Sequence, residues 1–179
     1  MVPEGNIILI GFMGAGKSSV GRLLAKRLGR SFVETDEMIV AKEGKPIAAI
    51  FAEHGEAYFR ALEAEVLAPL KLRRDGVITT GGGLPCGDGA MEALKSMGTV
   101  VWLRGDFGLI YERARRSGKR PMLAERSRGE VEALYHEREP HYREAHLTID
   151  VDGLSPDQVV ERIISELNAR NAKSEERRA

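Results

Sequence analysis

The sequence predicts an α/β fold in which helices cover both faces of a parallel sheet. Short apolar runs alternate with helical patterns along the chain. This alternation is typical of parallel sheets, because each pair of parallel strands needs a crossover connection that is usually a helix. We expect strands at 7–10, 77–80, 99–103 and 147–151, with 31–33 as a weaker fifth. We expect helices at 17–29, 36–53, 56–73, 88–97, 106–117, 129–144 and 156–170.

Size and composition fit one domain of this kind. The chain has 179 residues, of which 42% are hydrophobic, and 27 basic residues balance 27 acidic ones. A balanced charge gives no overall field that would recruit nucleic acid or an acidic membrane. We therefore expect neither as a partner, and we expect a monomer. We place a single domain at 1–170 and a frayed tail at 171–179.

The location of the protein is also constrained by its sequence. Cys86 is the only cysteine, so no disulfide can form within the chain, which fits a reducing compartment. We interpret Cys86 as a small packing residue. No apolar run approaches 18 residues, and the first residues lack a signal-peptide pattern. We expect a cytoplasmic protein.

The first strand leads into a glycine-rich turn. Residues 11–18 read Gly-Phe-Met-Gly-Ala-Gly-Lys-Ser, which matches G-x-x-x-x-G-K-[ST] and is followed by a helical pattern. In such a P-loop the backbone N–H groups surround phosphate, Lys17 reaches the β- and γ-phosphates, and the Ser18 hydroxyl binds Mg²⁺. A plain glycine-rich turn is the alternative, but the flanking strand and helix favour a nucleotide site. The predicted ATP-binding residues here are Gly14, Ala15, Gly16, Lys17, Ser18 and Ser19.

Polar residues follow the next two strands. Glu34 and Asp36 come after the weaker strand, and Gly81–Gly83 follow the strand at 77–80. A carboxylate pair at a strand end can hold Mg²⁺ through water or bind a hydroxyl, although helix capping by Thr35 or Asp36 alone would explain the pattern. Three successive glycines favour close approach of a ligand over a bare turn. These strand ends are the expected ligand edge of the sheet.

Two arginines lie in helical segments beside acidic residues. Arg60 and Glu63 share a helix face in Phe-Arg-x-x-Glu, and Arg138 lies in Arg-Glu-Pro-His-Tyr. Either arginine could form an ordinary surface ion pair or bind a carboxylate in a bidentate manner. The four histidines show no metal-ligand spacing, so we expect none of them to bind a metal.

One basic stretch interrupts the strand–helix pattern. Residues 113–128 hold seven Lys or Arg residues and one acid, and Gly118 and Pro121 break the helix. A charged surface segment is one interpretation. A mobile lid that brings cations to the phosphates is the favoured one, because the chain also carries a P-loop.

Taken in order, these motifs resemble the shikimate kinase family. The set comprises Gly11–Ser18, Glu34-x-Asp36, Phe59-Arg60-x-x-Glu63, Gly81–Gly83, Arg120-Pro121, Arg138-x-Pro140-x-Tyr142 and Pro156, and it spans residues 6–167. The resemblance implies a three-layer α/β/α fold of the P-loop kinase type, with a five-stranded parallel sheet and a mobile lid. It implies transfer of the γ-phosphoryl group of ATP to the 3-hydroxyl of shikimate, with Mg²⁺ as cofactor.

The resemblance also implies roles for individual residues. Asp36 would bind the accepting hydroxyl, and Lys17 and Arg120 would neutralise charge on the transferring group. The shikimate site would consist of Asp36, Arg60, Gly81, Gly82, Gly83 and Arg138, with Gly82 presenting a backbone N–H. Arg116, Arg120 and Pro156 would complete the ATP site. Phe51, Phe59 and Met122 would help to wall the cavity.

The chain departs from the family pattern at Glu34, where Asp is usual. Glu keeps the charge but reaches one methylene further, so its place near the metal is open. The residues Leu84-Pro85-Cys86 after the glycines are also less usual, and we assign them no role. The alternatives are another small-molecule P-loop kinase, such as a gluconate or nucleoside-monophosphate kinase, and a nucleotide-binding regulatory protein without turnover. The arginine pair with Asp36 favours a hydroxy acid as acceptor.

Overall fold

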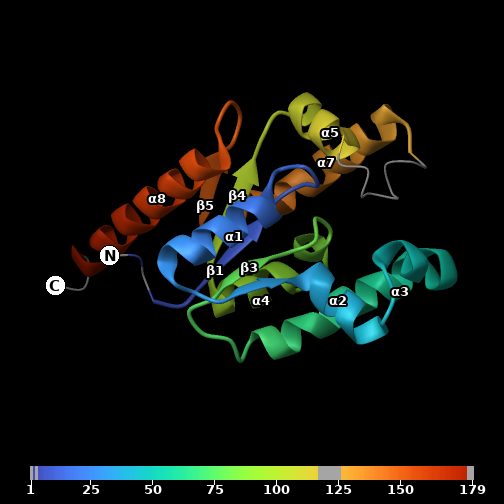
Figure 1. Ribbon diagram of the computed structural model, residues 1–179, viewed down its shortest axis with the longest axis horizontal. Helices are drawn as coiled ribbons and strands as arrows, with labels where there is room; N and C mark the ends of the chain where they lie inside the picture. The colour runs from blue at the N-terminus through green and yellow to red at the C-terminus, as the bar shows by residue number, and fades with distance from the viewer. Residues whose placement is uncertain (1, 3, 117–125, 177–179) are drawn as a thin grey trace.

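A five-stranded parallel sheet forms the centre of the molecule (Figure 1). The computed structural model describes residues 2, 4–116 and 126–176. The strands are β1 (Asn6–Ile10), β2 (Phe32–Glu34), β3 (Val77–Thr79), β4 (Gly98–Arg104) and β5 (Leu147–Asp150). They lie in the order β2-β3-β1-β4-β5, and every neighbouring pair is parallel. The predicted strands and their parallel pairing are confirmed.

Helices bury the sheet on both faces, and all five residues of β1 are buried. The helices are α1 (Lys17–Leu28), α2 (Thr35–Glu43), α3 (Ile47–Leu70), α4 (Ala90–Met97), α5 (Phe107–Arg116), α7 (Arg128–Tyr142) and α8 (Pro156–Glu176), with a short 3₁₀ helix η1 (Leu84–Cys86). Helices α1 and α8 pack against each other, whereas α3, α4 and α7 meet around η1. The described part of the chain holds no helix long and apolar enough to cross a membrane.

The helix boundaries differ from the expected ones between residues 36 and 73. The segment 36–53 is two helices, because Gly44 ends α2 in a left-handed conformation with φ 67° and Pro46 precedes α3. A glycine just past a helix end and a proline shortly afterwards are common stop signals. Helix α3 then runs to Leu70, interrupted at Gly55, whose φ of 78° and ψ of −179° are non-helical. The interruption lies where the sequence predicted a gap between two helices.

Helix α8 extends into the segment that the sequence predicted to be a frayed tail. Helix α8 begins at Pro156, as expected, with reciprocal bonds between Ser155 and Gln158. It continues to Glu176, past the predicted end at residue 170. Asn171 donates to Glu175 one turn further along this extension. The added turns contain Ala, Lys and Glu, which favour helix even where the segment is exposed.

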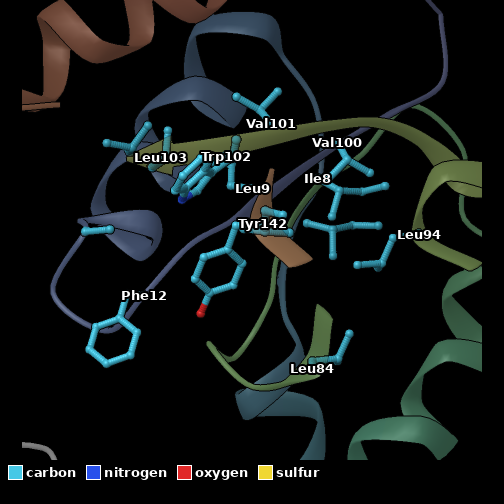
Figure 2. Close-up of a cluster of buried hydrophobic side chains, with 14 of the residues drawn as sticks. Ile8, Leu9, Phe12, Leu84, Leu94, Val100, Val101, Trp102, Leu103 and Tyr142 are labelled. Atoms are coloured by element: carbon cyan, nitrogen blue, oxygen red, sulfur yellow. The ribbon is translucent and has the colours of Figure 1, made fainter. Parts of the chain in front are cut away.

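The strand order indicates that a ligand site lies at the carboxyl ends of the central strands. Strand β1 lies between β3 and β4, so the chain leaves it at the point where the strand order changes direction. Ligands bind at such switch points in open α/β sheets. A close-up of the core shows the side chains of β1 and β4 packed together, with Tyr142 beside Trp102 (Figure 2). The two rings have centroids 5.9 Å apart.

Candidate active site

The loop between β1 and α1 is shaped to surround an anion. Gly14 has φ 85°, and a Cβ there would lie 2.4 Å from the carbonyl oxygen of Ile110, so only glycine fits. Helix α1 starts at Lys17, and its N-cap Gly16 provides no side-chain cap for the helix N-terminus. The positive end of the helix dipole therefore faces the loop.

Lys17 lies over this loop. Its side chain is buried, and Nζ donates to the carbonyl oxygens of Gly11 at 2.7 Å and Phe12 at 3.0 Å. The loop is also tied to α5, because Arg113 donates to the Gly14 carbonyl oxygen at 3.2 Å. Arg113 is therefore a second cation beside the loop. The sequence alone identified it only as part of the basic stretch at 113–128.

Ser18 and Glu34 are direct neighbours. The Ser18 hydroxyl donates to Oε1 of Glu34, and Arg22 donates to Oε2 of Glu34 at 2.6 Å. Arg22 also pairs with Glu37 at 2.7 Å. The longer side chain of Glu34 therefore still brings a carboxylate to the P-loop serine. A hydroxyl and a carboxylate are oxygen ligands of the kind that Mg²⁺ prefers.

Asp36 meets the glycine turn at the end of β3. A Cβ on Gly81 would lie 2.6 Å from Oδ1 of Asp36 and 3.0 Å from Oε1 of Glu63, so both carboxyl groups approach the same glycine. Thr35 does not cap α2. Its buried hydroxyl instead accepts from the Gly81 N–H at 3.0 Å, and Glu34 is the N-cap residue. The capping alternative for Thr35 is therefore wrong.

Arg60 packs onto the same turn from α3. Its guanidinium lies against Gly83, where a Cβ would come within 2.0 Å of Nη1. Nη1 donates to Glu63 at 2.6 Å, and Nη2 donates to Glu56 at 2.9 Å. Although burial opposes its charge, the pKa of Arg60 is raised by these two carboxylates. Burial raises the pKa of Glu63, against the opposing effect of the Arg60 charge.

Arg138 approaches the turn from α7. Its side chain is only 6% exposed, and its guanidinium lies 5.7 Å from the centre of the Phe12 ring. A Cβ on Gly82 would lie 3.2 Å from Nη1 of Arg138 and 3.5 Å from the Gly11 carbonyl oxygen. The two arginines therefore flank one glycine turn, and that turn adjoins the P-loop.

A cavity of about 570 Å³ opens between α3, η1 and α7. Arg60, Glu63 and Arg138 line it, together with Gly83 and the buried end of Leu84. Its size suits a small molecule. Paired guanidinium groups in a cavity of this kind suit a carboxylate, because each can donate two parallel hydrogen bonds.

Comparison with known proteins decides between the candidate families. The family model for shikimate kinase matches residues 13–168. The chain is 42% identical to shikimate kinase from Thermodesulfovibrio yellowstonii over 162 residues, covering 90% of this chain and 94% of the relative. The chain belongs to the shikimate kinase family. Shikimate kinase from Acinetobacter baumannii, solved in complex with shikimate, superposes with a TM-score of 0.88 at 38% identity, covering 93% and 94% of the two chains.

The shikimate kinase fold and the kinase class predicted from the sequence are confirmed. For the alternative family, the gluconate kinases, the comparison shows only a similar fold. A gluconokinase from Sinorhizobium meliloti superposes with a TM-score of 0.60 at 22% identity, covering 98% of this chain and 97% of the other. Identity this low shows a shared architecture and nothing about the acceptor.

The structure brings most of the predicted site residues together at one edge of the sheet. The P-loop, Glu34, Asp36, Gly81–Gly83 and Arg138 adjoin one another through the contacts above. Phe51 and Phe59 lie with ring centroids 4.6 Å apart, and Phe59 lies beside Arg60, but neither ring is among the described residues that line the cavity. Arg120, Pro121 and Met122 lie outside the described residues, as does most of the predicted lid.

The predicted adenine contacts lie on neighbouring segments. Arg116 is the last described residue of α5, and Pro156 is the first residue of α8. Asp152, in the loop before α8, accepts from the Asp106 N–H with both oxygens at 3.0 and 2.9 Å. This bond ties the start of α5 to the loop that leads to Pro156.

The sequence did not predict the contacts that three polar residues make in the site. Thr35 and Tyr142 bind the glycine turn, and Arg22 holds Glu34. Tyr142 stands in the family motif, yet the motif states no role for its hydroxyl. Arg22 and Glu34 lie twelve residues apart on different elements, so no local spacing could reveal their pairing.

Proposed function

We propose that this chain transfers the γ-phosphoryl group of ATP to the 3-hydroxyl of shikimate. The observation that carries the proposal is the glycine turn at Gly81–Gly83. It touches the P-loop on one side, and Asp36, Arg60 and Arg138 on the others. A site with one hydroxyl-binding carboxylate and two carboxylate-binding arginines fits a hydroxy acid. This arrangement supports shikimate as acceptor, as does the family to which the chain belongs.

In this proposal the nucleotide half holds and neutralises the phosphates. The N–H groups of the P-loop and Lys17 bind the phosphoryl oxygens, and Ser18 and Glu34 hold Mg²⁺. Mg²⁺ held there would help to neutralise the negative charge of the transferring group. Arg116 and Pro156 contact adenine, and Arg120 enters with the lid.

The acceptor half positions the attacking hydroxyl. Asp36 accepts a hydrogen bond from the 3-hydroxyl and takes its proton as the bond from that oxygen to the γ-phosphorus forms. The bond from the γ-phosphorus to the β–γ bridging oxygen breaks, and ADP leaves. Arg60 and Arg138 clamp the carboxylate, and Gly82 presents its N–H to the substrate. Catalysis of phosphoryl transfer depends mostly on such positioning and on charge stabilisation.

We propose that the monomer is the active unit and that it acts in the cytoplasm, where ATP is available. Light scattering on an active sample checks the first statement, and a dimer as the sole active species would contradict it.

An acceptor panel tests the function. ADP release is followed with ATP and Mg²⁺, offering shikimate, gluconate or a nucleoside monophosphate in turn. Of the three acceptors, we expect only shikimate to support ADP release. Folded protein that releases ADP with gluconate or a nucleotide, and not with shikimate, would refute the proposal.

A further inference from the structure

The glycine turn at Gly81–Gly83 is held by four hydrogen bonds, one of them from the Cys86 N–H to the Gly83 carbonyl oxygen at 3.0 Å. Its first N–H donates to Thr35 on α2 at 3.0 Å, and its first carbonyl oxygen accepts from the Leu84 N–H at 3.3 Å. Its second carbonyl oxygen, that of Gly82, accepts from the Tyr142 hydroxyl at 2.7 Å. The turn is therefore fixed on both sides without using every polar group it carries.

Two N–H groups of this turn remain for a ligand. Within the described part of the chain, neither the Gly82 N–H nor the Gly83 N–H donates a hydrogen bond to a protein group. All peptide bonds described are trans, so each N–H points opposite to the carbonyl of the same peptide unit. The bond from Tyr142 to the Gly82 carbonyl oxygen therefore sets the direction of the Gly83 N–H. The bond from Leu84 to the Gly81 carbonyl oxygen does the same for Gly82.

Tyr142 is itself rigidly placed. Its side chain is fully buried and packs beside Trp102, and its hydroxyl points out of the apolar cluster toward the segment that precedes Leu84 (Figure 2). The hydroxyl also lies beside Arg138, since a Cβ on Gly82 would have Tyr142 Oη at 3.5 Å and Arg138 Nη1 at 3.2 Å. One hydroxyl thus adjoins both the turn and the arginine of the proposed carboxylate clamp.

We infer that Tyr142 is a positioning residue for the acceptor substrate. It orients the Gly82–Gly83 peptide and so directs the Gly83 N–H, next to the Gly82 N–H of the proposed site, toward shikimate beside Arg138. Glycine residues need this support more than others do, because they have no side chain that restricts the backbone. The inference rests on the proposed function, and it adds a residue that acts through the turn and not on the substrate.

Tyr142→Phe tests the inference, because it keeps the buried ring and removes only the hydroxyl. We expect the KM and the dissociation constant for shikimate to rise roughly three- to tenfold, the effect of one net hydrogen bond. The KM for ATP and kcat should change less than twofold, because the lost contact acts equally on ground state and transition state.

Tyr135→Phe is the matched control. Tyr135 lies in the same helix, is 7% exposed, and donates to the Gly105 carbonyl oxygen at 2.9 Å, away from the glycine turn. Both variants should lose similar thermal stability, and only Tyr142→Phe should weaken shikimate binding. A Tyr142→Phe enzyme that binds shikimate normally would overturn the inference. An equal loss of ATP and shikimate affinity would overturn it as well.

Arg138→Ala, measured in parallel, separates this inference from the proposed function. If Arg138→Ala weakens shikimate binding and Tyr142→Phe does not, the role of Tyr142 is wrong and the site stands. If neither substitution affects shikimate binding, the proposed site itself is wrong.

Discussion

Replacing Arg138 by alanine should selectively weaken the use of shikimate. Arg138 is 6% exposed and packs against Phe12 and the glycine turn, so water does not screen its charge. A hydrogen bond to a charged group contributes about 1.5–3 kcal/mol. Since each 1.4 kcal/mol is a factor of ten, kcat/KM for shikimate should fall roughly 10- to 150-fold. The KM for ATP should stay within about twofold of the wild-type value, because the P-loop keeps its other contacts.

Initial rates at saturating ATP and varied shikimate measure this effect in a coupled ADP assay. Arg138→Lys should give an intermediate loss, because lysine keeps the charge and lacks the planar fork. Arg143→Ala, at the C-cap position that follows the same helix, is the control. Its side chain is 66% exposed and pairs with Glu139 at the surface, so its removal should leave shikimate kinetics unchanged. A normal shikimate KM in Arg138→Ala, or an equal loss in Arg143→Ala, would refute the clamp.

Three further predictions concern the rest of the chain. Gly55→Ala should lower the free energy of unfolding by about 1–3 kcal/mol, because φ 78° with ψ −179° suits only glycine. The free energy of unfolding is measured by urea titration. Gly129→Ala is the control: Gly129 lies in a helix and has open space for a Cβ, so this substitution should be neutral or stabilising. Burial raises the pKa of Cys86 to about 11, so its alkylation at pH 8 should be roughly a hundredfold slower than in the unfolded chain; equal rates would contradict this. Burial and nearby cations lower the pKa of His146, whose Nδ1 accepts from the Val100 N–H. Protonation of His146 therefore favours the unfolded chain. The free energy of unfolding should be unaffected by His146 above pH 6.5 and should fall as the pH drops below 6.5. A His146→Asn chain with the same pH dependence would contradict this.

The sequence was sufficient for the parts of the molecule that local chemistry determines. In the P-loop, Gly14 has a positive φ and lies in close contact with the backbone of Ile110. Both features require glycine, so the glycine pattern of the sequence predicts them. The start of α8 follows from Ser155, Pro156 and Gln158, which are local capping residues. The break at Gly44 was equally local, and it was missed because the apolar pattern continued across it.

The sequence could not predict contacts that depend on tertiary packing. Tyr142 meets the Gly82 carbonyl oxygen across 60 residues, and Thr35 meets the Gly81 N–H across 46. Neither pairing follows from periodicity or spacing. Glu34 illustrates the same limit, because only the structure shows that its longer side chain still reaches Ser18.

The identity of the phosphorylated product tests the central claim most directly. Wild-type protein is incubated with ATP, Mg²⁺ and shikimate, and the product is examined by correlation of phosphorus with proton resonances. We predict one phosphate monoester, attached at carbon 3 of shikimate and formed in equal amount to ADP. ATP consumption without phosphorylated shikimate, or a phosphate on another hydroxyl, would contradict the assignment of Asp36 and the arginine clamp.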